Sequence, residues 1–511
     1  MRQGLHILAK DIRRLRYHLL GAFTLWAVYA YLANHAAQYE GFTLRSRPIR
    51  MLYSQVLTFL PLTWAYLIAS AVHEEAMPGD RQFWLTRPYS RGSLLGGKAL
   101  FVGLFICLPA LVIAVVTLLR AGFSPALYVG DLAWSQVLLL CMGVLPFFAV
   151  ASVTRSLSQF ILTAIGCFVA FMVFNQAVSS FSRPVSWGGF EWVRSAFYLS
   201  VFALAGTAVA ALQFFRRRTA AARAVLAAGV VGAFLSMTFP WETAFAIQAR
   251  TAARRIAHDE VRLSFDPSRG RFQLGPSRNL GGPRFWVPVR LEHAPAMAVE
   301  AQYVEVSIRS ARGSWAASAI GHSSPAGLRW VREEGQYRLE FALDGPQYGA
   351  NGQLPVDLHV TAYFNLFGRG DTQRARLTGS DAPIPGLGIC RASDEVLNRG
   401  AITRVGCRMA FHPPQRAMMR LEHPSGAATE EMRLGGGPIG GIRHMSVMHP
   451  VEFQQAEFFR LSESGRVFEP GMLRDADLVV DLWRLEGHLK KELDIRGVKL
   501  EDWDVQPQPK P

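Results

Sequence analysis

The stretch Leu52–Val72, LYSQVLTFLPLTWAYLIASAV, is long and apolar enough to cross a bilayer and decides the fold of this chain. A second apolar run, Ala99–Leu119, follows it. Between them lies the polar segment His73–Lys98, HEEAMPGDRQFWLTRPYSRGSLLGGK. A hydrocarbon core of about 30 Å is crossed by roughly 20 apolar residues in a helix. The two runs therefore predict membrane helices joined by an unusually long loop.

The same pattern extends over residues 17–241, which we expect to form an α-helical polytopic membrane domain of six or seven spans. The first and last candidates are the shortest. The candidate spans are Tyr17–Ala33, Leu52–Val72, Ala99–Leu119, Leu132–Val153, Phe160–Ser180, Ala196–Phe215 and Ala224–Trp241.

Residues 1–16 precede the first span and contain apolar residues near one helical face and basic residues on another. The apolar residues are Leu5, Ile7, Leu8, Ile12 and Leu15. This pattern predicts a helix lying on the inner face of the membrane. An ordinary basic flank of the first span is an equal alternative.

Basic residues are concentrated in the apolar half of the chain. Residues 1–241 hold 20 Lys and Arg against 7 Asp and Glu, whereas residues 242–511 hold 34 against 32. A basic excess beside apolar spans indicates membrane orientation rather than nucleic-acid binding. If the N-terminus is inside, the inner connections carry 14 basic residues and the outer ones carry 6. We therefore expect a multi-pass protein of the cytoplasmic (inner) membrane, with the N-terminus and the His73–Lys98 loop in the cytoplasm.

Residues 242–511 alternate apolar and polar side chains with period two, as in Val304, Val306 and Ile308. Gly/Pro turn signals separate such runs. We expect a mainly antiparallel, sandwich-like β domain outside the cytoplasm. The Pro/Gly-rich stretch Ser380–Gly388 suggests two parts, residues 242–380 and 389–511.

Cys390 and Cys407 are the two cysteines of this polar half. An oxidising compartment would preserve a disulfide between them, closing a loop of roughly 16 residues and contributing about 3 kcal/mol. Two buried free thiols are the alternative. No histidine or cysteine cluster has metal-ligand spacing, so we expect no metal and no cofactor on this chain.

The membrane half contains two further features that could be functional. Asn175 and Gln176 lie in the fifth span, where polar groups are costly, so they suggest a transport path or a dimer interface. An equal alternative is that both residues lie near the outer end of that span and are hydrated. The residues Gly92-x4-Gly97-Lys98 nearly match a P-loop, but Ala99 replaces the required Ser or Thr. We expect these glycines to form the turn into the membrane, with Lys98 at its inner edge.

The His73–Lys98 loop resembles the corresponding loop of ABC-2-type permeases, the membrane subunits of ABC exporters. The resemblance rests on an acidic pair, a Pro-Gly step, the Trp-Leu-Thr-Arg-Pro-x-Ser-Arg segment, Leu-Leu and a lysine. These read here Glu74-Glu75, Pro78-Gly79, Trp84–Arg91, Leu94-Leu95 and Lys98. The match is close over about 30 residues and loose over residues 1–215, and the large β domain departs from a minimal six-span permease.

The resemblance implies a coupling helix in this loop that docks on a separate ABC ATPase subunit, which would bind ATP and magnesium. A second permease subunit, identical or different, would complete a dimer in the lipid bilayer. This chain would then be a transport subunit and not an enzyme. The residues expected to contact the ATPase are Glu74, Glu75, Arg81, Trp84, Leu85, Thr86, Arg87, Pro88 and Arg91.

Residue types in the loop agree with docking. Trp84 and Leu85 can anchor an interface, since aromatic residues dominate interface energetics. Arg81, Arg87 and Arg91 can pair with acidic groups and set register. The alternatives are a loop that lies on lipid headgroups, and a membrane-anchored sensor or binding protein whose β domain carries the function.

Overall fold

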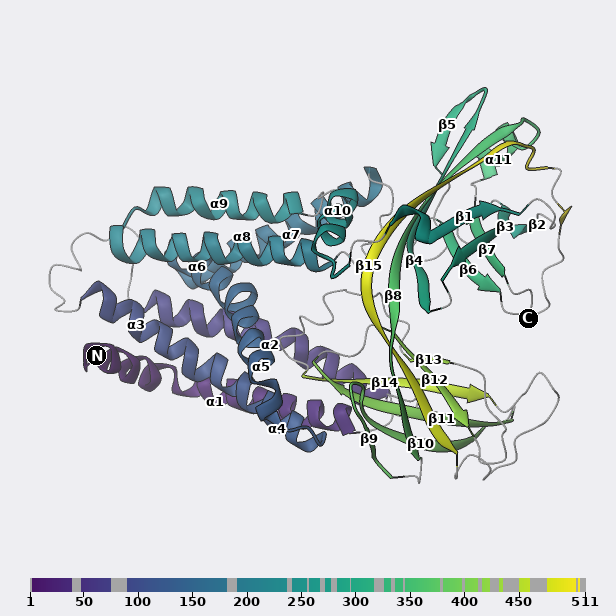
Figure 1. The fold of residues 1–511 in the computed structure, drawn as a ribbon. Helices are drawn as coiled ribbons and strands as arrows, with labels where there is room; N and C mark the ends of the chain where they lie inside the picture. Colours follow the sequence, from purple (N-terminus) through teal and green to yellow (C-terminus); the bar gives the residue numbers. More distant parts are fainter. Residues whose placement is uncertain are drawn as a thin grey trace.

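The computed structural model describes residues 2–38, 47–74, 90–181, 191–236, 241–254, 257–266, 272–276, 283–294, 296–316, 326–331, 336–342, 345–376, 380–397, 400–411, 416–422, 432–434, 450–459, 476–501 and 504–505. Helices occupy the described chain up to Thr251, and strands predominate after it (Figure 1). The predicted order of a helical region followed by a mainly antiparallel β region is confirmed.

The helical region is a bundle in which successive segments run in opposite directions (Figure 1). Three short π-helical segments, η2, η4 and η5, continue the α-helices that precede them. The elements are α1 (Arg2–Gln38), α2 (Arg47–His73), α3 (Arg91–Val102), η2 (Gly103–Cys107), α4 (Leu108–Arg120), η3 (Pro125–Tyr128), α5 (Val129–Leu138), η4 (Leu139–Val144), α6 (Leu145–Val153), α7 (Leu157–Phe181), α8 (Glu191–Ala211), η5 (Leu212–Arg216), α9 (Thr219–Leu235) and α10 (Trp241–Thr251).

Five helical segments of the described chain are long and apolar enough to cross a membrane. They are Met51–His73, Arg91–Arg120, Pro125–Val153, Leu157–Phe174 and Ser195–Arg216. The first predicted span lies in α1, which is not one of these five segments. The last predicted span begins in α9, a shorter apolar helix that is also not among them, and extends past its end. The chain is thus a membrane protein by its helices, while a count of six or seven spans stays a prediction.

Helix α1 is continuous from Arg2 to Gln38, with no break between residues 1–16 and the first predicted span. One face of it is buried along its whole length, at the three- and four-residue spacing of a packed helix. In its first half this face is formed by Gly4, Ile7, Asp11 and Leu15, whereas Leu5 is exposed. The N-terminal turns therefore pack against the bundle.

The described strands of the β region form two sheets. The larger has 12 strands with the main path β13-β12-β15-β8-β4-β6-β7-β3-β2-β16, plus β1 on β3 and β5 on β4. The smaller has the order β14-β11-β10-β9. The strands are β1 (Val261–Phe265), β2 (Phe272–Pro276), β3 (Pro283–His293), β4 (Met297–Ser310), β5 (Gly313–Ala316), β6 (Ala326–Val331), β7 (Gln336–Ala342), β8 (Val356–Arg376), β9 (Ala382–Ile384), β10 (Gly388–Leu397), β11 (Gly400–Ala410), β12 (Arg416–Glu422), β13 (Met432–Leu434), β14 (Val451–Phe459), β15 (Asp477–Val498) and β16 (Asp504–Val505).

Strands β8 and β15 contain 21 and 22 residues and pair antiparallel along nearly their full length. They curve through the β region from one end to the other (Figure 1). Both predicted parts, residues 242–380 and 389–511, therefore contribute strands to the larger sheet.

The two strands contribute to the two largest hydrophobic clusters of the described β region. The first is enclosed by the larger sheet and includes Phe285, Phe341 and Phe364. The second lies between the two sheets, where Val480 of β15 packs with Cys390 and Cys407 of the smaller sheet. Face-to-face sheet packing occurs at this end, and a sandwich spanning the whole β region stays a prediction.

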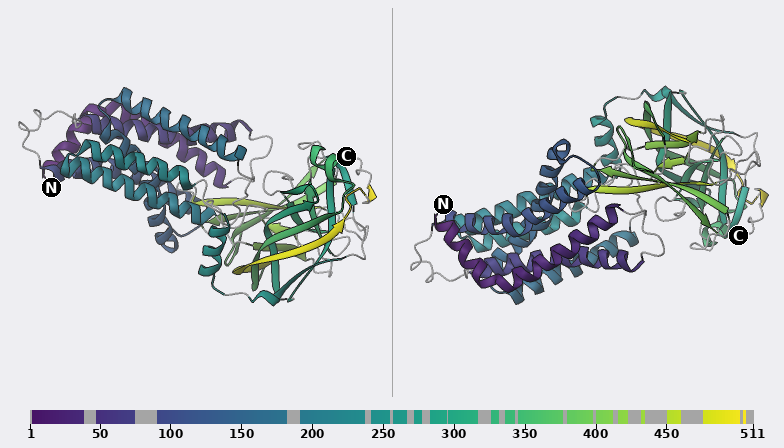
Figure 2. Two further views of the ribbon diagram at one scale, coloured as in Figure 1. Left: turned by 90° about the horizontal axis from the view of Figure 1, so that it is seen from above. Right: turned by 90° about the horizontal axis from the view of Figure 1, so that it is seen from below.

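Among the described residues, two clusters with aromatic side chains join the β region to the bundle. At the first, Phe245 of α10 packs edge-on against Tyr363 of β8, with ring centroids 4.9 Å apart, and Val193 of α8 joins the same cluster. At the second, Phe411 after β11 packs against Tyr128 of η3, with centroids 6.0 Å apart. Both contacts lie at the end of the bundle away from the N-terminus (Figures 1 and 2).

Candidate functional site

The predicted docking residues belong to the connection between α2 and α3. Glu74 and Arg91 border it and are described. The others lie outside the described residues, namely Glu75, Arg81, Trp84, Leu85, Thr86, Arg87 and Pro88. The helix ends around this connection lie at the end of the bundle away from the β region (Figure 1). We refer to residues 2–16, 73–74 and 90–98 as the border of the docking loop.

The first side of the border is an ion pair between α1 and the end of α2. The Nε atom of Arg14 lies 2.7 Å from Oε1 of Glu74. Arg14 is exposed whereas Glu74 is only 12% exposed, so the carboxylate is held against the bundle. His73 adds a second attachment, since its Nε2 lies 3.1 Å from both the Ala151 carbonyl oxygen and Thr154 Oγ1. The end of α2 is thereby fixed to α1 and to the end of α6.

The second side of the border is the start of α3. Ser90 caps this helix, because its side-chain oxygen accepts a hydrogen bond from the backbone N–H of Ser93 at 3.1 Å. The Ser90 N–H itself donates to Gln3 Oε1 of α1 at 3.4 Å. Arg91 donates from Nη1 to the Phe215 carbonyl oxygen of η5. The first turn of α3 is therefore held by both α1 and η5.

A buried ion pair lies one to two turns further along. Lys98 Nζ of α3 lies 2.7 Å from Asp11 Oδ2 of α1, and the side chains are 2% and 0% exposed. Removing two charges from water costs several kcal/mol per ion, and only close pairing recovers it. The pair therefore fixes how α1 and α3 lie against one another.

Glycine permits the close approach that brings these two helices together. A Cβ atom on Gly97 would lie 3.2 Å from the Gly4 carbonyl oxygen and 3.1 Å from Ile7 Cγ2. Gly92, Gly96 and Gly97 all lie within α3, which begins at Arg91. The expectation that these glycines form a turn into the membrane is wrong, because the Ser90 cap starts the helix before them. Lys98, expected at the inner edge of that turn, lies within α3 and is buried in the α1–α3 contact.

Helix α1 thus contacts both borders of the loop, through Arg14 on the α2 side and through Gln3 and Asp11 on the α3 side. A force applied to the loop would reach three helices together. Arg14 and Asp11 were missed in the sequence. Asp11 sits at the spacing of the buried face of α1, but its partner is 87 residues away. A lone acidic residue among basic ones was the only available signal.

The predicted transport-path residues lie on α7, near its end toward the β region. Gln176 is exposed on the surface of the bundle, and the side chain of Asn175 lies outside the described part. The outward face of α7 is apolar, with Leu162 and Val173 each more than 60% exposed. Gln176 therefore lies at the periphery of the bundle.

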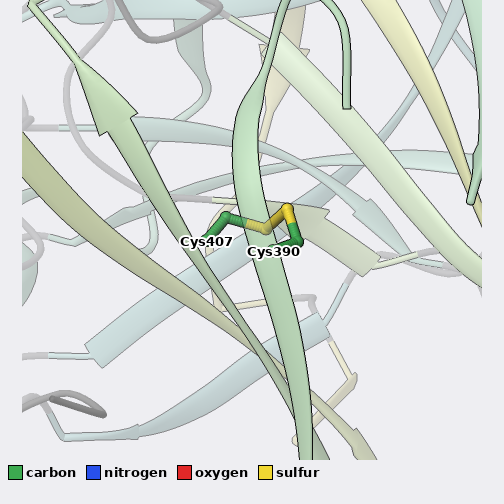
Figure 3. Close-up of a disulfide and its surroundings, with 2 residues drawn as sticks. All are labelled: Cys390 and Cys407. Carbon is green, nitrogen blue, oxygen red and sulfur yellow. A yellow bond between two sulfur atoms is a disulfide. The ribbon is translucent and has the colours of Figure 1, made fainter. Parts of the chain in front are cut away.

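The disulfide joins Cys390 and Cys407, which stand directly opposite each other on β10 and β11 (Figure 3). Both cysteines are fully buried in the core between the two sheets. Ala410 at the end of β11 and the following Phe411 belong to the second contact with the bundle. The disulfide therefore stabilises the strand that leads into that contact.

Within the described part of the chain, no three His, Cys, Asp or Glu residues gather closely enough to hold a metal ion. Comparison with known proteins found no matching family model, no matching curated protein and no matching solved structure.

Proposed function

We propose that this chain is the permease subunit of an ABC-2-type export system. The observation that supports it best is the attachment of α1 to both borders of the His73–Lys98 loop, through the Arg14–Glu74 and Lys98–Asp11 pairs. A partner that pushes on the loop would tilt α1, α2 and α3 as one unit. Such a unit is what a transport cycle driven from outside the chain requires.

The partner would be an ABC ATPase subunit that binds ATP and magnesium and docks on the loop. Trp84 and Leu85 would fill an apolar groove, and aromatic side chains contribute strongly to such interfaces. Arg87 would pair with acidic groups on the ATPase and set the register. ATP hydrolysis would take place on that chain, and this chain would carry no catalysis.

The membrane assignment of this proposal places the loop in the cytoplasm and the β region outside. Lys and Arg excess in the connections supports this orientation. The disulfide is consistent with it, since disulfides persist in oxidising compartments. A second permease subunit would cover the apolar face of α7, and lipid would surround the dimer.

Co-purification tests the docking. A Trp84→Ala/Arg87→Ala variant should lose the ATPase subunit that copurifies with the parent protein in mild detergent, with at least a tenfold drop in recovery. Gln82→Ala, in the same loop, is the matched control and should retain it. Unchanged recovery with the double variant would sink the docking proposal.

A membrane-anchored sensor or binding protein is the second candidate, supported by the size of the β region. Labelling with a membrane-impermeant thiol reagent tests on which side of the membrane the loop and the β region lie. A cysteine at Ser380 should be labelled in intact cells, and one at Gln82 only after the cells are opened. Labelling of Ser380→Cys only in opened cells would remove both the orientation and the external role of the β region. If orientation holds but the loop variants keep full function, the sensor is favoured.

A further inference from the structure

Strands β8 and β15 are the continuous link between the two ends of the β region. Strand β4 pairs with β8 only as far as Gly368. Strand β12 pairs with β15 only as far as Trp483, which stands opposite Arg369 of β8. Among the described strands, β8 and β15 alone therefore continue past this level, from one end of the β region to the other (Figure 1).

This level divides the β region into two lobes joined by a waist. The waist comprises residues 367–371 of β8 and 482–486 of β15. The first lobe comprises β1–β7, α11 (Gly345–Asn351), β16, residues 356–366 of β8 and residues 487–498 of β15. The second lobe comprises β9–β14, residues 372–376 of β8 and residues 477–481 of β15. Each lobe contains one of the two largest hydrophobic clusters.

The pairing of β8 with β15 is irregular at the waist. Its register shifts between Asp481 and Trp483, and again between Leu485 and Gly487. Such β-bulges bend a strand and interrupt its hydrogen bonds. Two of the three register shifts in this pair thus fall where the other strands of the sheet end.

Glycine permits a close crossing of the two strands at the same level. A Cβ atom on Gly370 would lie 2.6 Å from the Leu482 carbonyl oxygen, and one on Gly368 would overlap the Glu486 carboxylate. Glycine is also the residue that adapts its backbone most readily. Bulges and glycines together make the waist the stretch of this strand pair best able to change its backbone angles.

The two lobes are attached to different helices of the bundle. The first lobe is attached through Tyr363, which packs with Phe245 of α10 and Val193 of α8. The second lobe is attached through Phe411, which packs against Tyr128 of η3 in a cluster that includes Leu132 of α5. A shift of α8 and α10 relative to η3 and α5 would therefore move one lobe against the other.

Helix α10 is also linked to the waist itself. Arg254, three residues after this helix, donates its backbone N–H to the Glu486 carbonyl oxygen at 2.9 Å. Its Nη1 atom lies 3.2 Å from Oε2 of the same glutamate. Glu486 is the extra residue of the bulge between Leu485 and Gly487. Movement of α10 would therefore act directly on this bulge.

Arg416 spans the waist from the second lobe to the first. It begins β12, and its Nη1 atom lies 3.7 Å from Oε2 of Glu300 on β4. On the way its guanidinium carbon lies 5.7 Å from the ring centroids of both Phe367 and Trp483, within the range of a cation–π interaction. Arg416 and Glu300 are only 20% and 23% exposed, so solvent screens the pair little.

We propose that the waist is a hinge on which the two lobes change their angle, and that Arg416 is the latch that holds them at the angle of this structure. Hinges are short stretches that absorb backbone rotation between two packed bodies, as the waist does between the lobes. Because the lobes are attached to different helices, bending at the waist would follow rearrangement of the bundle. The hinge does not depend on an ATPase or on transport.

Double electron–electron resonance between spin labels on the two lobes tests the hinge. The labels are placed at Ala350→Cys in the first lobe and at Ser380→Cys, just before β9, in the second. Cys107, Cys141 and Cys167 are replaced by alanine, and the protein is held in lipid nanodiscs. The latched protein should give one narrow distance distribution. Arg416→Leu should broaden it about twofold or add a second distance, because the hinge loses its latch.

Glu300→Gln removes only the charge that pairs with Arg416, so it tests the latch if the leucine variant does not fold. It should broaden the distribution in the same direction. Arg284→Leu is the matched control, because it breaks a pair of similar length, 3.6 Å to Glu340, that lies entirely within the first lobe. It should leave the distribution unchanged. A distribution that Arg416→Leu and Glu300→Gln both leave unchanged, or equal broadening in Arg284→Leu, would overturn the proposal.

Discussion

At the scale of single residues, the buried pair of Asp11 and Lys98 has the clearest energetic consequence. Lys98→Met should lower the free energy of unfolding by about 3–5 kcal/mol, because the Asp11 carboxylate loses its partner inside the bundle. The expected readout is a lower thermal midpoint in detergent. Asp11→Leu/Lys98→Met should restore most of the loss, since an apolar pair of similar volume replaces the ion pair.

The control for this experiment is Lys490→Met, which breaks the Lys490–Glu492 pair on β15. Both partners there are about half exposed, and such pairs contribute roughly 0–1 kcal/mol. If Lys98→Met were as mild as the control, the pair would not fix the α1–α3 contact.

His488 of β15 predicts a pH dependence at the first contact between the β region and the bundle. It packs against Phe245 with ring centroids 5.9 Å apart, and its Nδ1 lies 2.7 Å from Asn365 Oδ1. Burial lowers the pKa of His488 from 6.5 to about 4. The folded state therefore binds fewer protons than the unfolded state below pH 6.5. The contribution of neutral His488 to the free energy of unfolding should be fully present above pH 6.5. It should be lost as the pH falls toward 4, which lowers the free energy of unfolding by up to roughly 3 kcal/mol.

Thermal midpoints measured from pH 7.5 to 4.5 test this dependence. His488→Gln should flatten the decline between pH 6.5 and 4.5, whereas His293→Gln, on the exposed end of β3, should keep it. An identical decline in the parent protein and in His488→Gln would assign the pH dependence to other groups.

At the scale of elements, α1 shows how much the sequence could predict. The apolar run Tyr17–Ala33 correctly predicted helix, but the boundary at residue 16 has no counterpart in the helix. Charged residues such as Arg13 and Arg14 made the first turns look amphipathic, while Asp11 interrupted the apolar face. The face is completed by Lys98 on another helix, and such a long-range pair is not visible in a local pattern.

The close packing of α1 and α3 predicts opposite effects for two neighbouring glycines. Gly97→Ala should cost about 1–3 kcal/mol, because the new methyl group meets Ile7 and the backbone of Gly4. Gly96→Ala faces open space and should be neutral or stabilising by up to about 1 kcal/mol. Thermal midpoints of the two variants give the comparison, and equal effects would contradict the packing.

The disulfide predicts a redox effect on β10 and β11. Reduction, or Cys390→Ser/Cys407→Ser, should lower stability by about 3 kcal/mol for a separation of 17 residues. A reducing agent should lower the thermal midpoint of the parent protein and leave that of the double variant unchanged. A reductant effect that persists in the double variant would point to another origin.

At the scale of the whole molecule, β8 and β15 hold the β region together and were only partly predictable. The alternation from Val356 to Phe364 gave the apolar half of β8. Its continuation to Arg376 carries charges, among them Arg374, which pairs with Glu422 of β12 at 3.0 Å. This second half of β8 is a strand because it pairs with β15, which is far away in the sequence. Neither the periodicity nor the composition of the sequence reveals such a pairing. For the same reason the two contacts with the bundle were not foreseen.

The helix ends that border the docking loop and the β region lie at opposite ends of the bundle (Figure 1). If an ATPase acts at the loop, its effect reaches the β region only through the helices. The two contacts, at Tyr363 and at Phe411, would then report helix movement to the β region. We therefore propose that the loop meets an ATPase and not only lipid.

Photo-crosslinking from position 84 tests that claim most directly. Trp84 would be replaced by a photoreactive phenylalanine analogue and irradiated in native membranes, with the same analogue at Ala350 in the β region as the control. We expect an adduct between position 84 and an ATP-binding subunit, and none between position 350 and that subunit. Adducts of position 84 with lipid alone would contradict it.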